Sequence, residues 1–547
     1  MLATNPALAG ATGTPDLSIA RPKLDHKPSK LTLLAFFGLL IASGIYMFYN
    51  LNHDITTASG APTTLMPYIL LGVALITALG FEFVNGFHDT ANAVATVIYT
   101  NSLPAPVAVV WSGFFNFLGV LLSSGLVAFG IIALLPVELI LQVGSGAGFA
   151  MIFALLIAAI LWNLGTWYFG LPASSSHTLV GSIVGVGIAN ALLHGRSATV
   201  GVDWAQVEKI GMSLLISPLV GFGLAAGLFW VTKKLLKSRP ELFEAPKENQ
   251  PPPLWVRALL ILTCTGVSFF HGSNDGQKGM GLIMLILVGV VPMAYGLNHT
   301  ISQKDTAQFA ALAQVTAQEL RATSSTGNVA VTGNSKLILS DFVRTKEVTP
   351  AVVPALAQTI DSIGAQVQTE PDMKRWDSKV VGNVRNDMYL TSESLKTLEK
   401  KQPELFQGKF KQDVDGFKRN IDSATKFIPT WVKVMVAIAL GLGTMVGWKR
   451  IVITVGEKIG KSHLTYGQGA SAELVAMSTI AAADMFGLPV STTHVLSSGV
   501  AGTMVANKAG LQKSTVKSLL MAWVLTLPAA IILSGTLYWL FSSLFVH

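Results

Sequence analysis

Charged residues are scarce in this chain. Asp, Glu, Lys and Arg make up only 12% of its 547 residues, whereas a soluble protein contains about a quarter. Hydrophobic residues make up 51%, the mean hydropathy is +0.54, and several apolar runs exceed the roughly 18 residues that span a bilayer. This composition excludes an ordinary soluble protein and predicts an all-α polytopic protein embedded in the lipid bilayer.

Cysteine and known catalytic motifs are also nearly absent. The single cysteine, Cys264, lies in an apolar run, which excludes an intrachain disulfide and a cysteine-based metal cluster. The chain has no H-E-x-x-H helix and no G-x-S-x-G elbow, the motifs of metalloproteases and serine hydrolases. The net charge of +8 does not indicate nucleic-acid binding, because the basic residues lie mainly beside apolar runs and in one long loop. We therefore expect no enzyme, no cofactor and no nucleic-acid partner.

Polar segments divide the chain. Residues 298–428 hold 17 Lys/Arg and 15 Asp/Glu and show helical periodicity, which predicts a soluble helical insertion. Residues 31–51 are expected to be a retained helix rather than a cleaved leader, since a largely polar segment of 30 residues precedes them. The division that we predict is a cytoplasmic tail with an extra transmembrane helix (1–64), transmembrane repeat 1 (65–232), a cytoplasmic linker (233–253), the start of repeat 2 (254–297), the insertion (298–428) and the remainder of repeat 2 (429–547).

Two pairs of motifs indicate a duplication. In the first half N-G-F-H-D-T-A-N (85–92) is followed by G-L-P-A-S-S-S-H (170–177). In the second half H-G-S-N-D-G-Q-K (271–278) is followed by G-L-P-V-S-T-T-H (487–494). From the aspartate to the closing histidine is 88 positions in the first half, and 219 in the second, which becomes 88 once the 131-residue insertion is left out.

Basic residues in the short loops predict the orientation in the membrane. Loops 233–257, 449–463 and 508–517 are rich in Lys and Arg, whereas loops 52–64 and 132–147 contain none. With the N-terminal tail inside, eleven net crossings satisfy all five loops. Repeat 1 then starts outside and repeat 2 inside, which predicts two inverted-topology repeats, as in many secondary transporters. The same count places the insertion outside.

Segments 65–100 and 254–297 are too long for one straight span. The first would reach about 54 Å as a helix, against about 30 Å of hydrocarbon, and both contain a polar motif. We expect broken helices whose unwound middle lines a cavity, since unpaired backbone cannot face lipid. The G-L-P motifs are expected in re-entrant-like hairpins that approach the midplane from opposite faces.

Titratable residues inside apolar segments are costly and indicate function. They are Glu82, His88, Asp89, His177, His271, Asp275, Lys278, Glu473, Asp484 and His494. The first motif type joins the carboxylates Asp89 and Asp275 to the amides Asn92 and Asn274. Such oxygens suit a hard cation or a proton, and their repetition argues against mere bonding between neighbouring helices.

The second motif type places three hydroxyl residues after a proline. They are Ser174, Ser175 and Ser176 in the first half and Ser491, Thr492 and Thr493 in the second. Proline suits the first turn of a helix, and a helix N-terminus presents free N–H groups to an anion. Ordinary N-capping needs only one hydroxyl. We therefore predict an anion site between the two motifs, with His177 and His494 contacting the anion, relaying protons or packing. Lys278 either offsets the anion's charge or pairs with Asp275.

With these four motifs the chain resembles the inorganic phosphate transporter (Pit) family, most closely its bacterial low-affinity members. The motifs at Asp89 and Asp275 resemble the family's G-A-N-D-V-A-N-A-type signatures, and those ending at His177 and His494 resemble its G-L-P-[VI]-S-x-T-H signatures. The resemblance implies proton-coupled import of inorganic phosphate, alone or as a complex with Mg²⁺ or another divalent metal. It also implies a homodimer in the bacterial inner membrane.

The resemblance extends to single residues. It implies phosphate binding by the six hydroxyl residues together with Asn92 and Asn274. We expect ion or proton coupling to involve Asp89, Asp275, Glu473, His177, His494 and Lys278. The motifs define no certain metal site.

Three departures from the family pattern favour protons over sodium as the coupling ion. Phe87 and His88 stand where the family often has Ala-Asn, Lys278 adds a fixed positive charge, and Asn116 stands where sodium-coupled relatives tend to carry Glu. The alternatives are sodium coupling or another oxyanion such as sulfate, because hydroxyls do not distinguish tetrahedral anions. An anion channel or a membrane hydrolase is the alternative of another class.

Overall fold

The computed structural model describes most of the chain. The described residues are 22, 24–25, 28–59, 66–135, 140, 144–199, 202–246, 251–299, 301–323 and 333–545, without the side chains at 59, 89–92, 303, 323, 378 and 545. These residues form helices joined by short turns, which confirms the predicted all-α class.

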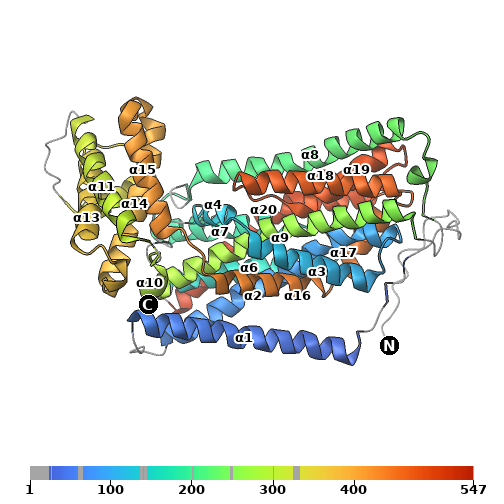
Figure 1. The fold of residues 1–547 in the computed structure, drawn as a ribbon, viewed down its shortest axis with the longest axis horizontal. Helices are drawn as coiled ribbons and strands as arrows, with labels where there is room; N and C mark the ends of the chain where they lie inside the picture. Colours follow the sequence, from blue (N-terminus) through green and yellow to red (C-terminus); the bar gives the residue numbers. More distant parts are fainter. Residues whose placement is uncertain are drawn as a thin grey trace.

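The helices fall into a long bundle and a separate group at one end of it (Figure 1). The bundle contains α1 (Lys30–Ser59), α2 (Met66–Tyr99), α3 (Ala105–Leu122), α4 (Leu126–Ile132), α6 (Gly146–Tyr168), α7 (Ser175–Leu193), α8 (Trp204–Leu235), α9 (Leu254–Val290), α10 (Pro292–Tyr295), α16 (Thr430–Thr444), α17 (Lys449–Ile453), α18 (Tyr466–Met485), α19 (Thr492–Ala506) and α20 (Lys513–Phe545). The separate group contains α11 (Gln303–Thr323), α12 (Ser335–Thr345), α13 (Val352–Thr369), α14 (Ser378–Lys401) and α15 (Gly408–Thr425).

Among the described residues, eight helices are long and apolar enough to cross a membrane. They are α1, α2, α3, α6, α7, α8, α9 and α20. Helices α16, α18 and α19 lie in the same bundle; α16 and α19 have only 15 residues each. Apolar side chains such as Leu34, Leu219 and Val524 are more than two-thirds exposed on the bundle. Such a surface is stable in lipid and not in water, so the predicted multi-pass membrane architecture holds.

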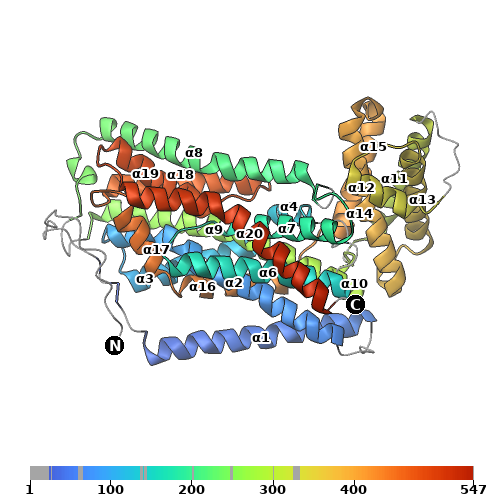
Figure 2. The same ribbon diagram turned by 180° about the vertical axis from the view of Figure 1, so that it is seen from behind.

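The group α11–α15 has a hydrophobic core of its own. Phe309, Leu356, Val414 and other apolar side chains from these helices are buried together, in a cluster distinct from those of the bundle. The group stands at the end of the bundle opposite to the start of α1 (Figures 1 and 2). It corresponds to the polar insertion, whose composition supports a water-exposed, self-contained unit.

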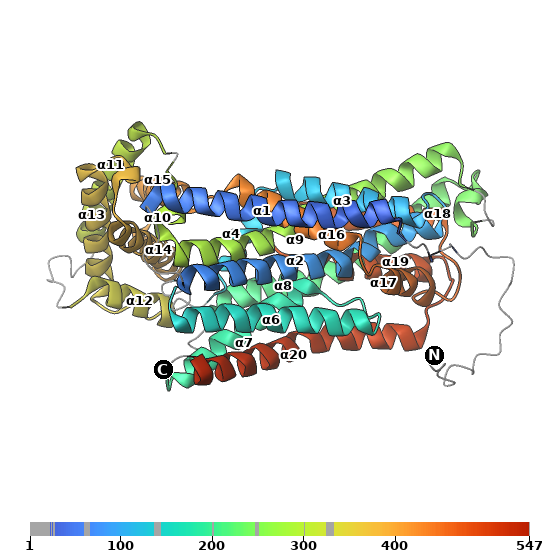
Figure 3. The same cartoon turned by 90° about the horizontal axis from the view of Figure 1, so that it is seen from below.

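The two halves of the bundle repeat the same packing. Helix α7 packs on α20 as α19 packs on α8, and α2 packs on α16 as α9 packs on α3. The matching helices α2 and α9 run in opposite directions along the bundle, as do α8 and α20 (Figure 3). Pro218 inside α8 and Pro528 inside α20 extend the correspondence. These relations support the duplication, and the inverted orientation in the membrane stays a prediction.

The prediction that segments 65–100 and 254–297 are broken in the middle is wrong. Helix α2 runs without interruption over Met66–Tyr99, and α9 over Leu254–Val290. In α9 the polar side chains bond sideways to other helices and turns, as Gln277 does to Asp484. The backbone therefore keeps its own hydrogen bonds, and the interruption that polar residues suggested is unnecessary.

Interruptions occur elsewhere. Helix α3 ends before Ser123, and α4 begins after Gly125, so the apolar run over residues 105–131 forms two helices. Two tight turns also join α6 to α7 and α18 to α19. These two hairpins contain the G-L-P motifs.

Candidate functional site

The G-L-P motifs form matching turns that each start a helix. Gly170 and Gly487 adopt φ of 66° and 63°, a region that favours glycine, and reverse the chain after α6 and α18. Ser174 and Ser491 are then the N-caps of α7 and α19, each accepting a hydrogen bond from the backbone N–H three residues later. One hydroxyl of each triplet is thus used for capping, and two remain at each helix start.

The two helix starts meet face to face. The Oγ of Ser176 donates a 2.8 Å hydrogen bond to the carbonyl of Val490, just before α19. The rings of His177 and His494 lie with their centroids 4.8 Å apart. All six hydroxyl residues are at most 5% exposed. Two helix N-termini therefore direct their positive ends at one buried point, which favours an anion there.

Two polar atoms at this point have no hydrogen-bond partner among the described residues. They are the hydroxyl Oγ1 of Thr492, in the first turn of α19, and Nδ1 of His177, in the first turn of α7. Buried polar atoms without a partner cost free energy. Beside the opposed helix starts, both atoms are placed where a bound ligand could satisfy them.

An ion pair from α9 borders the same point. The Nζ of Lys278 lies 2.8 Å from Oδ1 of Asp275, and both side chains are buried. Lys278 also donates a hydrogen bond to Ser176, and Ser175 donates a 3.5 Å hydrogen bond to Asp275. Lys278 thus pairs with Asp275 and also contacts the hydroxyl cluster, while its role in offsetting the charge of an anion stays a prediction.

Histidine and asparagine side chains extend this network. The Nε2 of His271 lies 3.7 Å from Oδ2 of Asp275, and its Nδ1 lies 2.8 Å from Oδ1 of Asn116. Asn116 in turn donates a 3.2 Å hydrogen bond to Thr444 on α16. Asp275 is therefore linked to α16 through His271 and Asn116.

Asn274 holds the turn before α19. Its Nδ2 donates to the carbonyl of Leu488 at 3.1 Å, and its Oδ1 accepts from the N–H of Val490 at 3.3 Å. Both ends of the amide are thus occupied by backbone. Asn274 is a predicted phosphate ligand, and its contacts favour a positioning role at the start of α19.

Glu473 lies in a separate polar group. Its carboxylate accepts hydrogen bonds from Thr96 on α2 and Thr263 on α9. None of the six hydroxyl residues is among its hydrogen-bond partners within the described chain. The structure therefore joins Asp275, Lys278, His177 and His494 at the hydroxyl cluster and leaves Glu473 apart from it.

Two predicted residues, Asp89 and Asn92, lie on α2 at positions whose side chains are outside the described residues. Their backbone belongs to the continuous helix, and their roles stay predictions. A cluster of three or more His, Cys, Asp or Glu that could hold a metal does not occur among the described residues.

The sequence analysis missed Trp523 on α20. Its indole stacks on His494 with centroids 4.2 Å apart and donates a 3.1 Å hydrogen bond to the carbonyl of Pro172. Trp523 therefore contacts both hairpins. Nothing in its local sequence marks it, since a tryptophan in an apolar run is ordinary.

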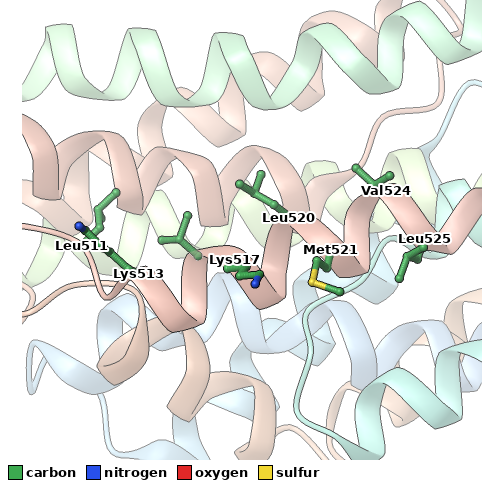
Figure 4. Close-up of a pocket in the computed structure, with 8 residues that line it drawn as sticks. Leu511, Lys513, Lys517, Leu520, Met521, Val524 and Leu525 are labelled. Carbon is green, nitrogen blue, oxygen red and sulfur yellow. The ribbon is translucent and has the colours of Figure 1, made fainter. Parts of the chain in front are cut away.

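A hollow of about 580 Å³ on the outward side of α20 lies apart from these groups (Figure 4). Its lining is mostly apolar, and Leu520 and Val524 are 51% and 71% exposed. This is the surface expected to face lipid, and none of the candidate site residues lines it.

Comparison with known proteins decides the family. The model of the phosphate transporter family matches residues 85–534, which include both motif pairs. The chain belongs to this family. The family is one of transporters, so the expectation that the chain is not an enzyme is confirmed, as is the predicted resemblance to Pit proteins.

Several phosphate transporters resemble the chain over most of their length. The low-affinity inorganic phosphate transporter PitB of Escherichia coli (strain K12) is 43% identical, covering 86% of this chain and 96% of the relative. PitA of the same strain is 42% identical with the same coverage. The low-affinity inorganic phosphate transporter of Buchnera aphidicola subsp. Acyrthosiphon pisum is 39% identical, covering 91% and 98%.

One solved structure resembles the chain at low identity. It is described as the sodium-dependent phosphate transporter, is 19% identical, covers 86% of this chain and 98% of its own, and gives a TM-score of 0.45.

Proposed function

We propose that this transporter imports inorganic phosphate by proton symport and binds it between the N-termini of α7 and α19. The observation that carries the proposal is the pair of unpartnered buried atoms, Thr492 Oγ1 and His177 Nδ1, where the two helix starts meet. A phosphate oxygen can accept from the hydroxyl, and the helix ends favour its charge. The names of the relatives support phosphate over other tetrahedral anions.

The ion pair suggests how a proton is coupled to phosphate. Asp275 neutralises Lys278 at 2.8 Å. A proton on Asp275 removes that negative charge and leaves the ammonium, which already contacts Ser176, to attract an anion. By the same linkage, phosphate beside Lys278 competes with Asp275 and favours its protonation. Proton and phosphate therefore bind together, as a symporter requires.

The ion pair between Lys278 and Asp275 argues against sodium binding at the Asp275 carboxylate. Asp275 already has a fixed cation in contact, and His271 lies on its other oxygen at 3.7 Å. A sodium ion would have to displace Lys278 into a buried position without a counter-charge, which is expensive. Sodium coupling through other residues remains the alternative within the class.

Uptake into proteoliposomes tests the proposal. We expect labelled phosphate to accumulate under an imposed pH gradient (acidic outside) without sodium, and excess sulfate to leave the rate unchanged. Uptake that requires sodium would overturn the proton coupling. Flux that only equilibrates would support an anion channel, and release of phosphate from a phosphoester without flux would support a hydrolase.

The resemblance to the Pit family supports three further parts of the proposal. The chain is placed in the bacterial inner membrane, assembles as a homodimer, and carries phosphate alone or with a divalent metal such as Mg²⁺. Co-transport of labelled phosphate and metal at a constant ratio, in the same vesicles, tests the last part. Uptake that is unchanged when a chelator removes divalent metals would show that phosphate travels alone.

A further inference from the structure

The insertion and the membrane bundle together line a cavity with many charged side chains. The cavity has a volume of about 890 Å³ and lies between α4, the start of α8, and helices α14 and α15 of the insertion. Figure 1 shows the insertion standing over this end of the bundle. We call this cavity the basic vestibule.

The vestibule has an excess of positive charge. Five basic and two acidic side chains line it. Lys396 pairs with Glu393 at 3.2 Å, and Lys426 pairs with Asp422 at 2.8 Å. Both acidic side chains of the lining are therefore paired, and three basic side chains have no acidic partner in the lining.

The remaining basic side chains are Lys209, Arg385 and Lys400. None of them forms an ion pair with a carboxylate among the described residues, and Nε of Arg385 is buried without a hydrogen-bond partner there. Burial lowers the pKa of the Arg385 guanidinium to about 10, so the group is still charged at neutral pH. Lys209 comes from α8 and the other two from α14, so only the docked insertion brings the three charges together.

The vestibule reaches the hairpin that carries half of the candidate site. Met485, Phe486 and Gly487, the turn between α18 and α19, form part of its wall. The N-cap Ser491 follows four residues after Gly487, and α19 then begins at Thr492. An anion held in the vestibule therefore lies against the same turn whose far end presents hydroxyls to the transported anion.

We propose that the basic vestibule is a second anion-binding site, which captures inorganic phosphate before it enters the transport site. This inference rests on the proposed function. A cavity with three uncompensated cations and low-dielectric walls raises the local concentration of anions by tenfold or more at low ionic strength. Salt screens charges over about 8 Å at physiological ionic strength, so the effect weakens as salt is added.

The experiment compares two triple variants of the full chain in proteoliposomes of neutral phosphatidylcholine. The test variant is Lys209→Gln, Arg385→Gln, Lys400→Gln. The control removes three exposed charges of the insertion that do not line the vestibule, by Lys374→Gln, Lys379→Gln, Lys409→Gln. Since Arg385 is partly buried, the double variant Lys209→Gln, Lys400→Gln accompanies the triple one and tests the charge with changes at exposed positions only.

At low ionic strength we expect the test variants to raise the KM for phosphate at least about threefold with an unchanged maximal rate. The control should stay within the error of the unaltered chain, and the difference should shrink as salt is raised. Equal KM values for the test and control variants, when the unaltered chain does take up phosphate, would overturn the proposal that the vestibule captures phosphate. Absence of uptake by the unaltered chain would instead overturn the proposed function.

A lipid phosphate presents the same chemistry as free phosphate. The variants are therefore also compared in vesicles that contain phosphatidylglycerol. A change in KM that appears in neutral vesicles supports capture of inorganic phosphate. A change seen only with the anionic lipid would show that the three cations hold a headgroup, and would overturn the proposal.

Discussion

The imidazole rings of His177 and His494 lie with their centroids 4.8 Å apart, although one belongs to each half of the chain. Each ring sits in the first turn of a helix whose N-cap is a serine three residues earlier. His494 is also stacked on Trp523. The contact brings the two repeated motifs together at one point, where we propose that phosphate binds.

Replacement of His177 by glutamine tests whether this ring has a part in coupling. Glutamine keeps a hydrogen-bonding side chain near the anion but cannot titrate. If His177 relays protons, accumulation driven by a pH gradient falls about tenfold, while exchange of labelled for unlabelled phosphate continues. Equal loss of both activities would assign His177 to binding, and no loss of either would leave it a packing residue.

The hydroxyls of Thr492 and Ser491 should have separable roles. Thr492→Val keeps the shape but removes the unpartnered Oγ1, so we expect the KM for phosphate to rise about tenfold, the effect of one hydrogen bond to a charged group. Ser491→Ala removes the N-cap of α19 and should cost about 1 kcal/mol of stability. Uptake kinetics and thermal unfolding of both variants check this contrast, which would be refuted by an unchanged KM in the valine variant.

Substitution of Asp275 by asparagine should uncouple transport. The neutral amide mimics the protonated carboxyl permanently, so Lys278 stays available to phosphate while no proton can be exchanged. We expect loss of accumulation against a gradient and retention of phosphate exchange, measured in the same vesicles. Asp484→Asn is a matched control, because Asp484 also bonds to α9, through Ser273 and Gln277. Normal accumulation by the Asp275 variant would remove this carboxylate from the mechanism.

The insertion should lose stability in acid through Glu399. Burial opposes ionisation of this carboxyl, but its hydrogen bond from Lys411 and the charge of Lys418 outweigh that effect and hold its pKa below the usual range. Its stabilising effect is therefore complete above the unfolded-state pKa of about 4.3 and is lost as the pH falls through the lower folded-state value.

Melting curves of the Glu399→Gln variant test whether the Glu399 carboxylate stabilises the insertion at neutral pH and loses this effect in acid. The variant should melt below the unaltered chain at pH 7, and the gap should close as the pH is lowered below about 4. The gap is expected to be small, because partly exposed ion pairs contribute less than about 1 kcal/mol. A gap that widens in acid would contradict the assignment.

Much of the architecture follows from the order of residues alone. Apolar runs, the scarcity of charge and the polar stretch 298–428 suffice for an all-α membrane protein with an insertion, because the cost of placing residues in lipid sums along the chain. The two G-L-P motifs identified the helix starts at Ser174 and Ser491, since proline, small hydroxyls and capping act within one turn. The family resemblance rested on the same local patterns.

Only the tertiary structure decided what these residues touch. The polar motif of α9 suggested an unwound backbone, yet Asn274 and Gln277 find partners on other elements and the helix stays intact. The stacking of Trp523 on His494, the separation of Glu473 from the hydroxyl cluster, and the gathering of Lys209 with Arg385 each join positions far apart in the chain. Such contacts depend on how whole helices pack, and packing depends on the shapes of many side chains at once. For this reason the sequence determined the elements and the kinds of groups, and the fold decided which groups form a site.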